Sequence, residues 1–119
     1  MGAAFLLPRL VGAGRAYEML AMGEFVSARD AERIGLYNTV VPAARLEDET
    51  QALAGRLAAG PAFALGMTKT MLDREMAMDL DAALEAEAQA QAICMEHPDY
   101  REAYEAFLAK RPPRFGGRG

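Results

Sequence analysis

The chain has 119 residues, of which 52% are hydrophobic and 25% charged, enough for one folded domain at most. A net charge of −4 argues against a nucleic-acid partner, which would need a basic face. The single cysteine, Cys94, excludes an internal disulfide and fits a reducing cytoplasm, and no apolar run is long enough to span a membrane.

The first third predicts two helices. Ala16, Met19 and Leu20 form an apolar stripe over residues 15–22, and Gly23 is placed to end that helix. Ser27 followed three residues later by Asp30 resembles a capping box, which predicts a short helix to residue 34 with Gly35 in the left-handed conformation after it.

Residues 36–41, Leu-Tyr-Asn-Thr-Val-Val, are rich in β-branched side chains and are followed by Pro42, which predicts one short strand. Leu46, Leu53 and Leu57 then space a helix that Gly60 and Pro61 end.

The last half predicts three more helices. Phe63, Met67 and Met71 recur every four residues and indicate a helix over residues 61–78. Asp79 is a candidate cap for the next helix, His97-Pro98 breaks that helix, and Asp99 starts the last one. The Pro/Gly/Arg-rich residues 112–119 predict a frayed tail.

Several polar residues are candidates for a binding or catalytic role, but their sequence context favours a structural role. Arg9, among apolar neighbours, could anchor a phosphate, but a bond to backbone carbonyls at the start of a helix is the favoured prediction. His97, the only histidine, is expected to end a helix. Asp81 and Glu85 are spaced to share a helix face, which is expected to be its solvated side.

Five segments, in this order, resemble the C-terminal half of the crotonase (enoyl-CoA hydratase/isomerase) family. They are Leu7-Pro8-Arg9-Leu10-Val11-Gly12, the run from Leu20 to Ala28, the run from Ala31 to Pro42, Pro61–Lys69 with its Thr68-Lys69 pair, and the ending from Ala106-Phe107 through Lys110-Arg111-Pro112 to Phe115.

The resemblance implies a fold that is mostly α: the C-terminal part of a crotonase-like α/β spiral, with one short strand followed by a helical trimerisation region. Residues 1–60 would end the spiral core, and residues 61–119 would form the C-terminal oligomerisation helices. It also implies a homo-oligomer, a trimer or a dimer of trimers, in the cytoplasm. The Ala- and Met-rich helices are in any case expected to leave apolar surface for a partner.

The family's chemistry is implied in the same way. An acyl-CoA thioester is held by two backbone N–H groups as an enolate forms, and carboxylates move the protons. No separate cofactor is expected. The family's catalytic groups would lie upstream of Met1, so no catalytic residue is predicted within the chain. Hydration of a 2-enoyl-CoA is the predicted activity.

Phe107 and Lys110 match the aromatic and basic residues that the family places near the adenine and phosphates of CoA. Three residues apart, they would share one face of the last helix. The alternatives are a core aromatic for Phe107 and a solvated lysine for Lys110. For the whole chain, the alternative function is a stand-alone helical oligomerisation or interaction module without catalysis.

Overall fold

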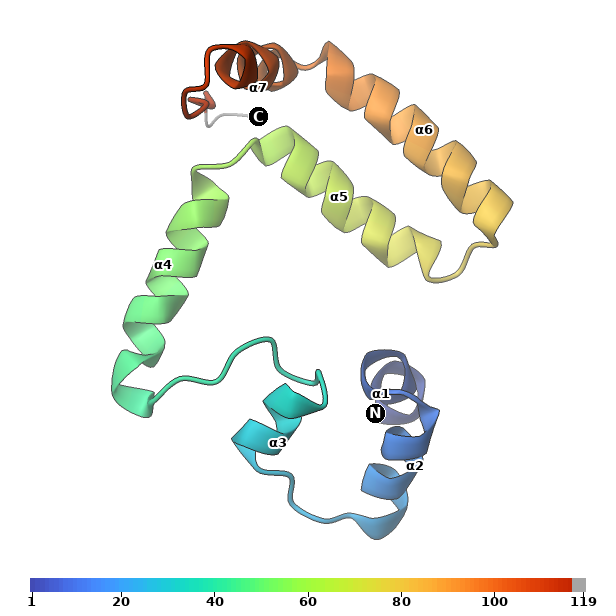
Figure 1. Ribbon diagram of the computed structural model, residues 1–119. Helices are drawn as coiled ribbons and strands as arrows, with labels where there is room; N and C mark the ends of the chain where they lie inside the picture. Colours follow the sequence, from blue (N-terminus) through green and yellow to red (C-terminus); the bar gives the residue numbers. More distant parts are fainter. Residues whose placement is uncertain (117–119) are drawn as a thin grey trace. The chain divides into compact units, whose positions relative to one another are not determined.

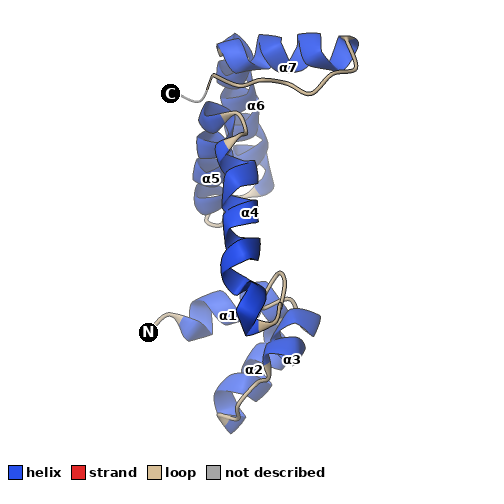
Figure 2. Cartoon of the chain, turned by 90° about the vertical axis from the view of Figure 1, so that its left-hand side faces the viewer, coloured by secondary structure: helices blue, strands red, loops and turns tan. Residues whose placement is uncertain are grey.

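The computed structural model describes residues 1–116, and these contain helices but no strand (Figures 1 and 2). The mostly helical class predicted from the sequence is therefore confirmed. The elements are α1 (Ala3–Val11), α2 (Ala13–Met22), α3 (Ala28–Arg33), the 3₁₀ turn η1 (Ala43–Arg45), α4 (Leu46–Ala58), α5 (Ala62–Glu75), α6 (Leu80–Glu96) and α7 (Pro98–Leu108). In residues 1–116, no helix combines the length and apolar character needed to cross a bilayer.

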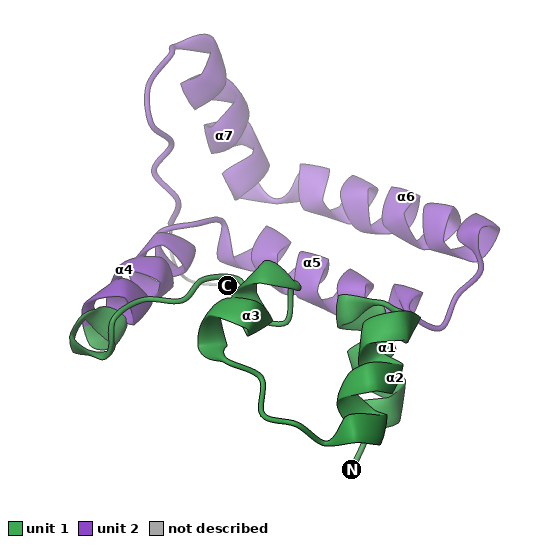
Figure 3. Ribbon diagram, turned by 60° about the horizontal axis from the view of Figure 1, so that its bottom comes forward, with its two compact units in different colours: residues 1–47 green, residues 48–119 purple. Residues whose placement is uncertain are grey.

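The chain divides into two compact units, residues 1–47 and 48–119 (Figure 3). In the first unit, α1 packs against α2, and the two helices are separated only by Gly12, whose φ of 83° lets the chain change direction. Helix α1, which contains Pro8, was not predicted from the sequence. The buried side chains of this unit are Val11, Ala16 and Ala31.

Helix α3 begins and ends as predicted. The Ser27 Oγ accepts a hydrogen bond from the Asp30 N–H at 3.1 Å and donates one to Asp30 Oδ2 at 2.6 Å. At the other end Gly35 has a φ of 81°, and its N–H donates to the Glu32 carbonyl at 3.0 Å while the Leu36 N–H donates to the Ala31 carbonyl at 2.8 Å. These two bonds define a Schellman motif.

The short strand predicted over residues 36–41 is not a strand. A strand needs a neighbouring strand to pair its backbone, and residues 1–116 contain none. The Val40 N–H instead donates to Glu32 Oε1, a side-chain acceptor on α3, at 2.8 Å. The β-branched composition of this segment was therefore misleading.

In the second unit, α5 and α6 lie side by side, joined by a short turn, and α7 packs against α6 (Figures 1 and 3). Asp79 caps α6 as predicted, because its Oδ1 accepts from the Ala82 N–H at 2.8 Å. The rings of Phe63 and His97 stack with centroids 4.7 Å apart and planes 4° apart, which ties the start of α5 to the end of α6. Ala90 and Ala106 are the buried side chains among the described residues of this unit.

The predicted break between α4 and α5 is confirmed at Gly60 and Pro61. A Cβ on Gly60 would lie 2.9 Å from Cδ1 of the flexible Leu65 side chain and 3.1 Å from the Leu57 carbonyl oxygen, so the turn is tight at this position and favours glycine.

The frayed tail predicted for residues 112–119 is wrong in its first part. The Arg111 side chain and the Arg114 backbone are hydrogen-bonded back to α7 through Glu102, as described below. Residues 117–119 lie outside the described residues.

Most apolar side chains remain exposed within each unit. Among residues 1–116, the buried hydrophobic residues are one valine and four alanines, whereas large side chains such as Phe25, Leu53, Leu57, Leu72 and Phe107 are all more than half exposed. On α4, no residue is buried. Faces of this kind on helices normally lie against another surface.

We therefore predict that the isolated chain self-associates. Light scattering at tens of micromolar should give a mass well above 12.9 kDa, and replacing Leu53 and Leu57 by Gln should lower it because these side chains supply apolar area on α4. Replacing the exposed Gln51 by Ala is the matched control. A monodisperse monomer would contradict the prediction.

Candidate functional site

The start of α7 is fixed by His97. The His97 Nδ1 accepts a hydrogen bond from the Asp99 N–H at 3.3 Å, which caps the helix, and Pro98 occupies the first helical position. The same Nδ1 lies 3.5 Å from Asp99 Oδ2, a contact that is an ion pair only when the ring is protonated. His97 thus ends α6, as predicted, and also begins α7.

Phe107 lies in the last turn of α7 with 80% of its surface exposed. Its neighbour Ala106 is 1% exposed and faces the inside of the unit. Within this chain Phe107 is therefore not a core aromatic, and its ring faces are open to another molecule.

Lys110 lies beyond the end of α7, so it does not share a helix face with Phe107 as the spacing predicted. Instead its N–H donates to the Phe107 carbonyl at 3.1 Å, and the Arg111 N–H donates to the Ala106 carbonyl at 3.0 Å. This is a Schellman motif with lysine at the left-handed position. The turn, rather than the helix, brings Lys110 next to Phe107.

The backbone of Lys110 is unusual. Its φ is 51°, and among residues 1–116 it is the only residue other than glycine with a positive φ. The same motif at the end of α3 uses Gly35, which has no Cβ and adopts this conformation without strain. A lysine there costs roughly 1–2 kcal/mol, which the surrounding structure must offset.

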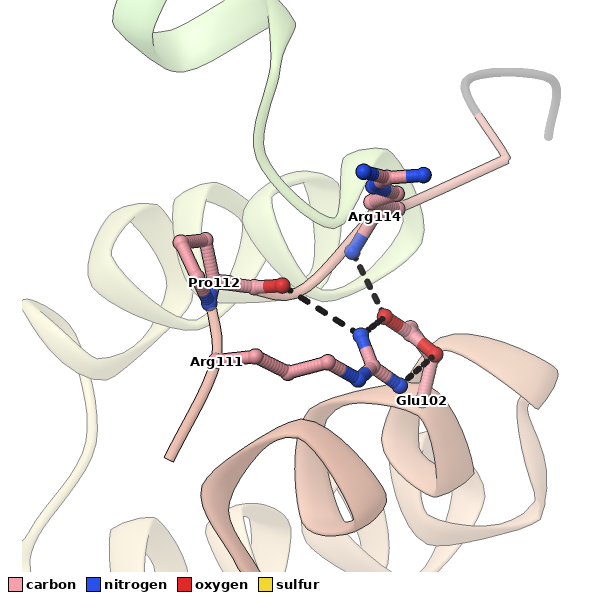
Figure 4. A network of polar contacts seen from close by, with 4 residues as sticks. All are labelled: Glu102, Arg111, Pro112 and Arg114. Carbon is pink, nitrogen blue, oxygen red and sulfur yellow. Dashed lines mark hydrogen bonds and ion pairs between the residues drawn. The ribbon is translucent and has the colours of Figure 1, made fainter. Parts of the chain in front are cut away.

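Glu102 holds the segment that follows Lys110 (Figure 4). Its Oε1 and Oε2 accept from Arg111 Nη1 at 2.6 Å and Nη2 at 3.0 Å, a bidentate ion pair. Its Oε1 also accepts from the Arg114 backbone N–H at 2.7 Å. The hydrogen bond from Arg111, with that from Arg114, lowers the pKa of Glu102 to about 2. A hollow of about 480 Å³ is lined by these three residues and Pro112.

This network was not predicted from the sequence. Glu102 and Arg111 are nine residues apart, a spacing that matches no pairing along one helix, and the pair forms only because the chain turns back after α7. The charges alone carry no signal for it.

The other candidates have structural roles. The Arg9 Nη1 donates to the Phe5 carbonyl at 2.6 Å, and the guanidinium lies 3.7 Å from the centroid of the Phe5 ring. The predicted bond to a backbone carbonyl is confirmed, although Arg9 lies near the end of α1 rather than at its start. Glu85 accepts a hydrogen bond from Gln89 at 2.8 Å on the exposed side of α6.

Comparison with known proteins assigns the family. The sequence profile described as enoyl-CoA hydratase/isomerase matches residues 1–118. The chain belongs to this family. The resemblance seen in the five sequence segments is thereby confirmed.

Individual relatives agree with this assignment. The chain is 38% identical over 117 residues to the 1,2-epoxyphenylacetyl-CoA isomerase of Escherichia coli, covering 98% of this chain and 45% of that protein. It is 38% identical over 109 residues to the crotonyl-CoA hydratase of Syntrophomonas wolfei, covering 92% and 42%. A crystal structure of a provisionally named enoyl-CoA hydratase from Streptomyces coelicolor A3(2) matches with a TM-score of 0.91 and 47% identity, covering 98% and 42%. The chain therefore spans slightly less than half the length of these relatives.

The Glu102 network should depend on pH in a defined window. Because the pKa of Glu102 is about 2 in the folded chain and 4.5 ordinarily, its contribution to stability is complete above pH 4.5 and is lost as the pH falls toward 2. NMR titration of the Arg114 amide and the Arg111 side chain should show a midpoint near 2. The Glu102→Gln variant should abolish that transition, and a midpoint near 4.5 in the unaltered chain would contradict it.

Proposed function

We propose that this chain is the C-terminal portion of an enzyme that hydrates 2-enoyl-CoA thioesters, and that Phe107 and Lys110 contact the CoA moiety. The observation that carries the proposal is the 80% exposed ring of Phe107 beside a lysine whose backbone is held in the left-handed conformation. The names of two matched relatives, 1,2-epoxyphenylacetyl-CoA isomerase and crotonyl-CoA hydratase, support a CoA thioester as substrate.

The chemistry of these two residues fits the nucleotide end of CoA. An exposed phenyl ring offers a face on which adenine can stack, and an ammonium is a point charge suited to a phosphate. The chain carries a net charge of −4, so a polyanionic ligand needs a local site of positive charge. Lys110, Arg111 and Arg114 supply one after α7, even though Glu102 neutralises part of it.

The reaction itself needs groups that we do not assign to this chain. Hydration through an enolate requires two backbone N–H donors at the thioester oxygen and carboxylates that add water across the double bond. The proposal places both upstream of Met1, in the part of the relatives that this chain does not match. The exposed apolar faces of α4 to α7 would then join that part or other copies in a trimer or a dimer of trimers. The lone Cys94 supports a cytoplasmic location.

Binding of CoA tests the proposed contacts. Phe107→Ala and Lys110→Ala should each weaken CoA binding by roughly tenfold, since each removes one stacking face or one charge-assisted contact. Isothermal titration with CoA measures this. Leu108→Ala, at the residue after Phe107, and Lys69→Ala, on α5, are matched controls, because each removes an exposed side chain of similar size or charge. Unchanged affinity in both Phe107 and Lys110 variants would remove the ligand role.

Turnover tests the enzyme assignment. The coding DNA upstream of Met1 should continue in frame into a Gly-rich turn followed by a glutamate. The longer product should hydrate crotonyl-CoA, which is measured as the loss of the absorbance of the enoyl thioester. A stop codon directly upstream, together with a 119-residue product that associates but does not turn over crotonyl-CoA, would favour the alternative, an oligomerisation module without catalysis.

A further inference from the structure

We infer that Glu102 is a positioning residue for coenzyme A: by binding Arg111 and the backbone of Arg114 it holds the turn after α7, and this keeps Lys110 next to Phe107. The inference rests on the proposed function, because it concerns how the same two contacts are presented. It assigns Glu102 no contact with the ligand.

The turn needs such a restraint because Lys110 disfavours it. A residue with a Cβ in the left-handed region persists only where the surrounding structure determines its conformation. The two Schellman bonds after α7 have equivalents after α3, where Gly35 takes the place of Lys110 and adopts the left-handed conformation without strain. The end of α7 therefore needs an additional restraint on its left-handed residue, whereas the end of α3 does not.

Glu102 supplies that restraint from one side chain. Both of its carboxylate oxygens are used, at 2.6 and 3.0 Å to the Arg111 guanidinium and at 2.7 Å to the Arg114 N–H. Arg111 directly follows Lys110, and Arg114 lies three residues further on, so the carboxylate fixes the path on which the chain leaves the turn (Figure 4). Since Glu102 lies on α7 itself, the same helix carries both the restraint and Phe107.

The ion pair between Glu102 and Arg111 also affects which cationic side chain is available to bind a phosphate of CoA. The guanidinium of Arg111, itself a good phosphate ligand, is committed to Glu102 on two nitrogens. In residues 1–116 the Lys110 ammonium has no hydrogen bond or ion pair. The phosphates of CoA are therefore expected to meet Lys110, and Arg111 contributes by shaping the turn.

The test compares Glu102→Gln with Glu105→Gln in the full 119-residue chain. Both variants remove one negative charge from α7. The Glu105 side chain makes no hydrogen bond to the turn and acts on Arg111 through its charge alone, so Glu105→Gln controls for the loss of charge. Titration with CoA should show roughly tenfold weaker binding for Glu102→Gln, comparable to Lys110→Ala, and less than a twofold change for Glu105→Gln. Titration with pantetheine, which lacks the nucleotide, should give the same affinity in all variants.

A second readout reports the turn directly. The amide-to-Hα NMR coupling of Lys110 should indicate the left-handed conformation in the unaltered chain and in Glu105→Gln, and should change in Glu102→Gln. Arg111→Lys keeps the charge but loses the planar fork, so it should give an intermediate loss of CoA affinity.

The outcomes separate the two proposals. If Lys110→Ala weakens CoA binding while Glu102→Gln changes neither CoA affinity nor the Lys110 coupling, the positioning role is overturned and the proposed function stands. If CoA affinity is equal, or absent, in the unaltered chain and in the Phe107, Lys110 and Glu102 variants, both are overturned. Equal loss of pantetheine and CoA affinity in Glu102→Gln would overturn the positioning role as well.

Discussion

Hydrogen bonds at the helix ends, rather than a packed core, determine where α3, α6 and α7 begin. In the part of the chain that the structure describes, the buried hydrophobic side chains are Val11 and four alanines, which contribute little apolar area. By contrast, individual caps are well formed: Ser27 on α3, Asp79 on α6 and His97 on α7 each accept an N–H of the first turn. A side-chain cap typically stabilises a helix by about 1 kcal/mol, so these three caps are a substantial part of what stabilises α3, α6 and α7.

This dependence on local bonds explains why so many boundaries could be predicted from the sequence. A cap or a left-handed glycine involves residues within four positions of one another, so Ser27, Gly35 and Asp79 indicate their roles without any knowledge of the rest of the fold. Gly60-Pro61 marks a break for the same reason.

Features that depend on distant residues were the ones missed. Residues 36–41 have strand-like composition, but a strand exists only with a partner, and the Val40 N–H is satisfied by Glu32 instead. Pro8 lies inside α1, where its missing N–H argues against a helix when the sequence is considered alone. The contact between Glu102 and Arg111 depends on the turn at Lys110. The left-handed residue of that turn is a lysine, whereas a glycine would have allowed the turn to be predicted from the sequence.

Two polar residues at helix ends, His97 and Lys110, differ in how far contacts within the chain explain their positions. His97 is accounted for by its surroundings, since its Nδ1 caps α7 and its ring stacks on Phe63, so no further role is needed to explain it. Lys110 is the reverse case. Its backbone would be better served by glycine, as at Gly35, and its ammonium contributes no bond within the described residues. The positive φ of Lys110 and its unpaired ammonium are the two features of the described residues that the proposed contact with CoA would account for.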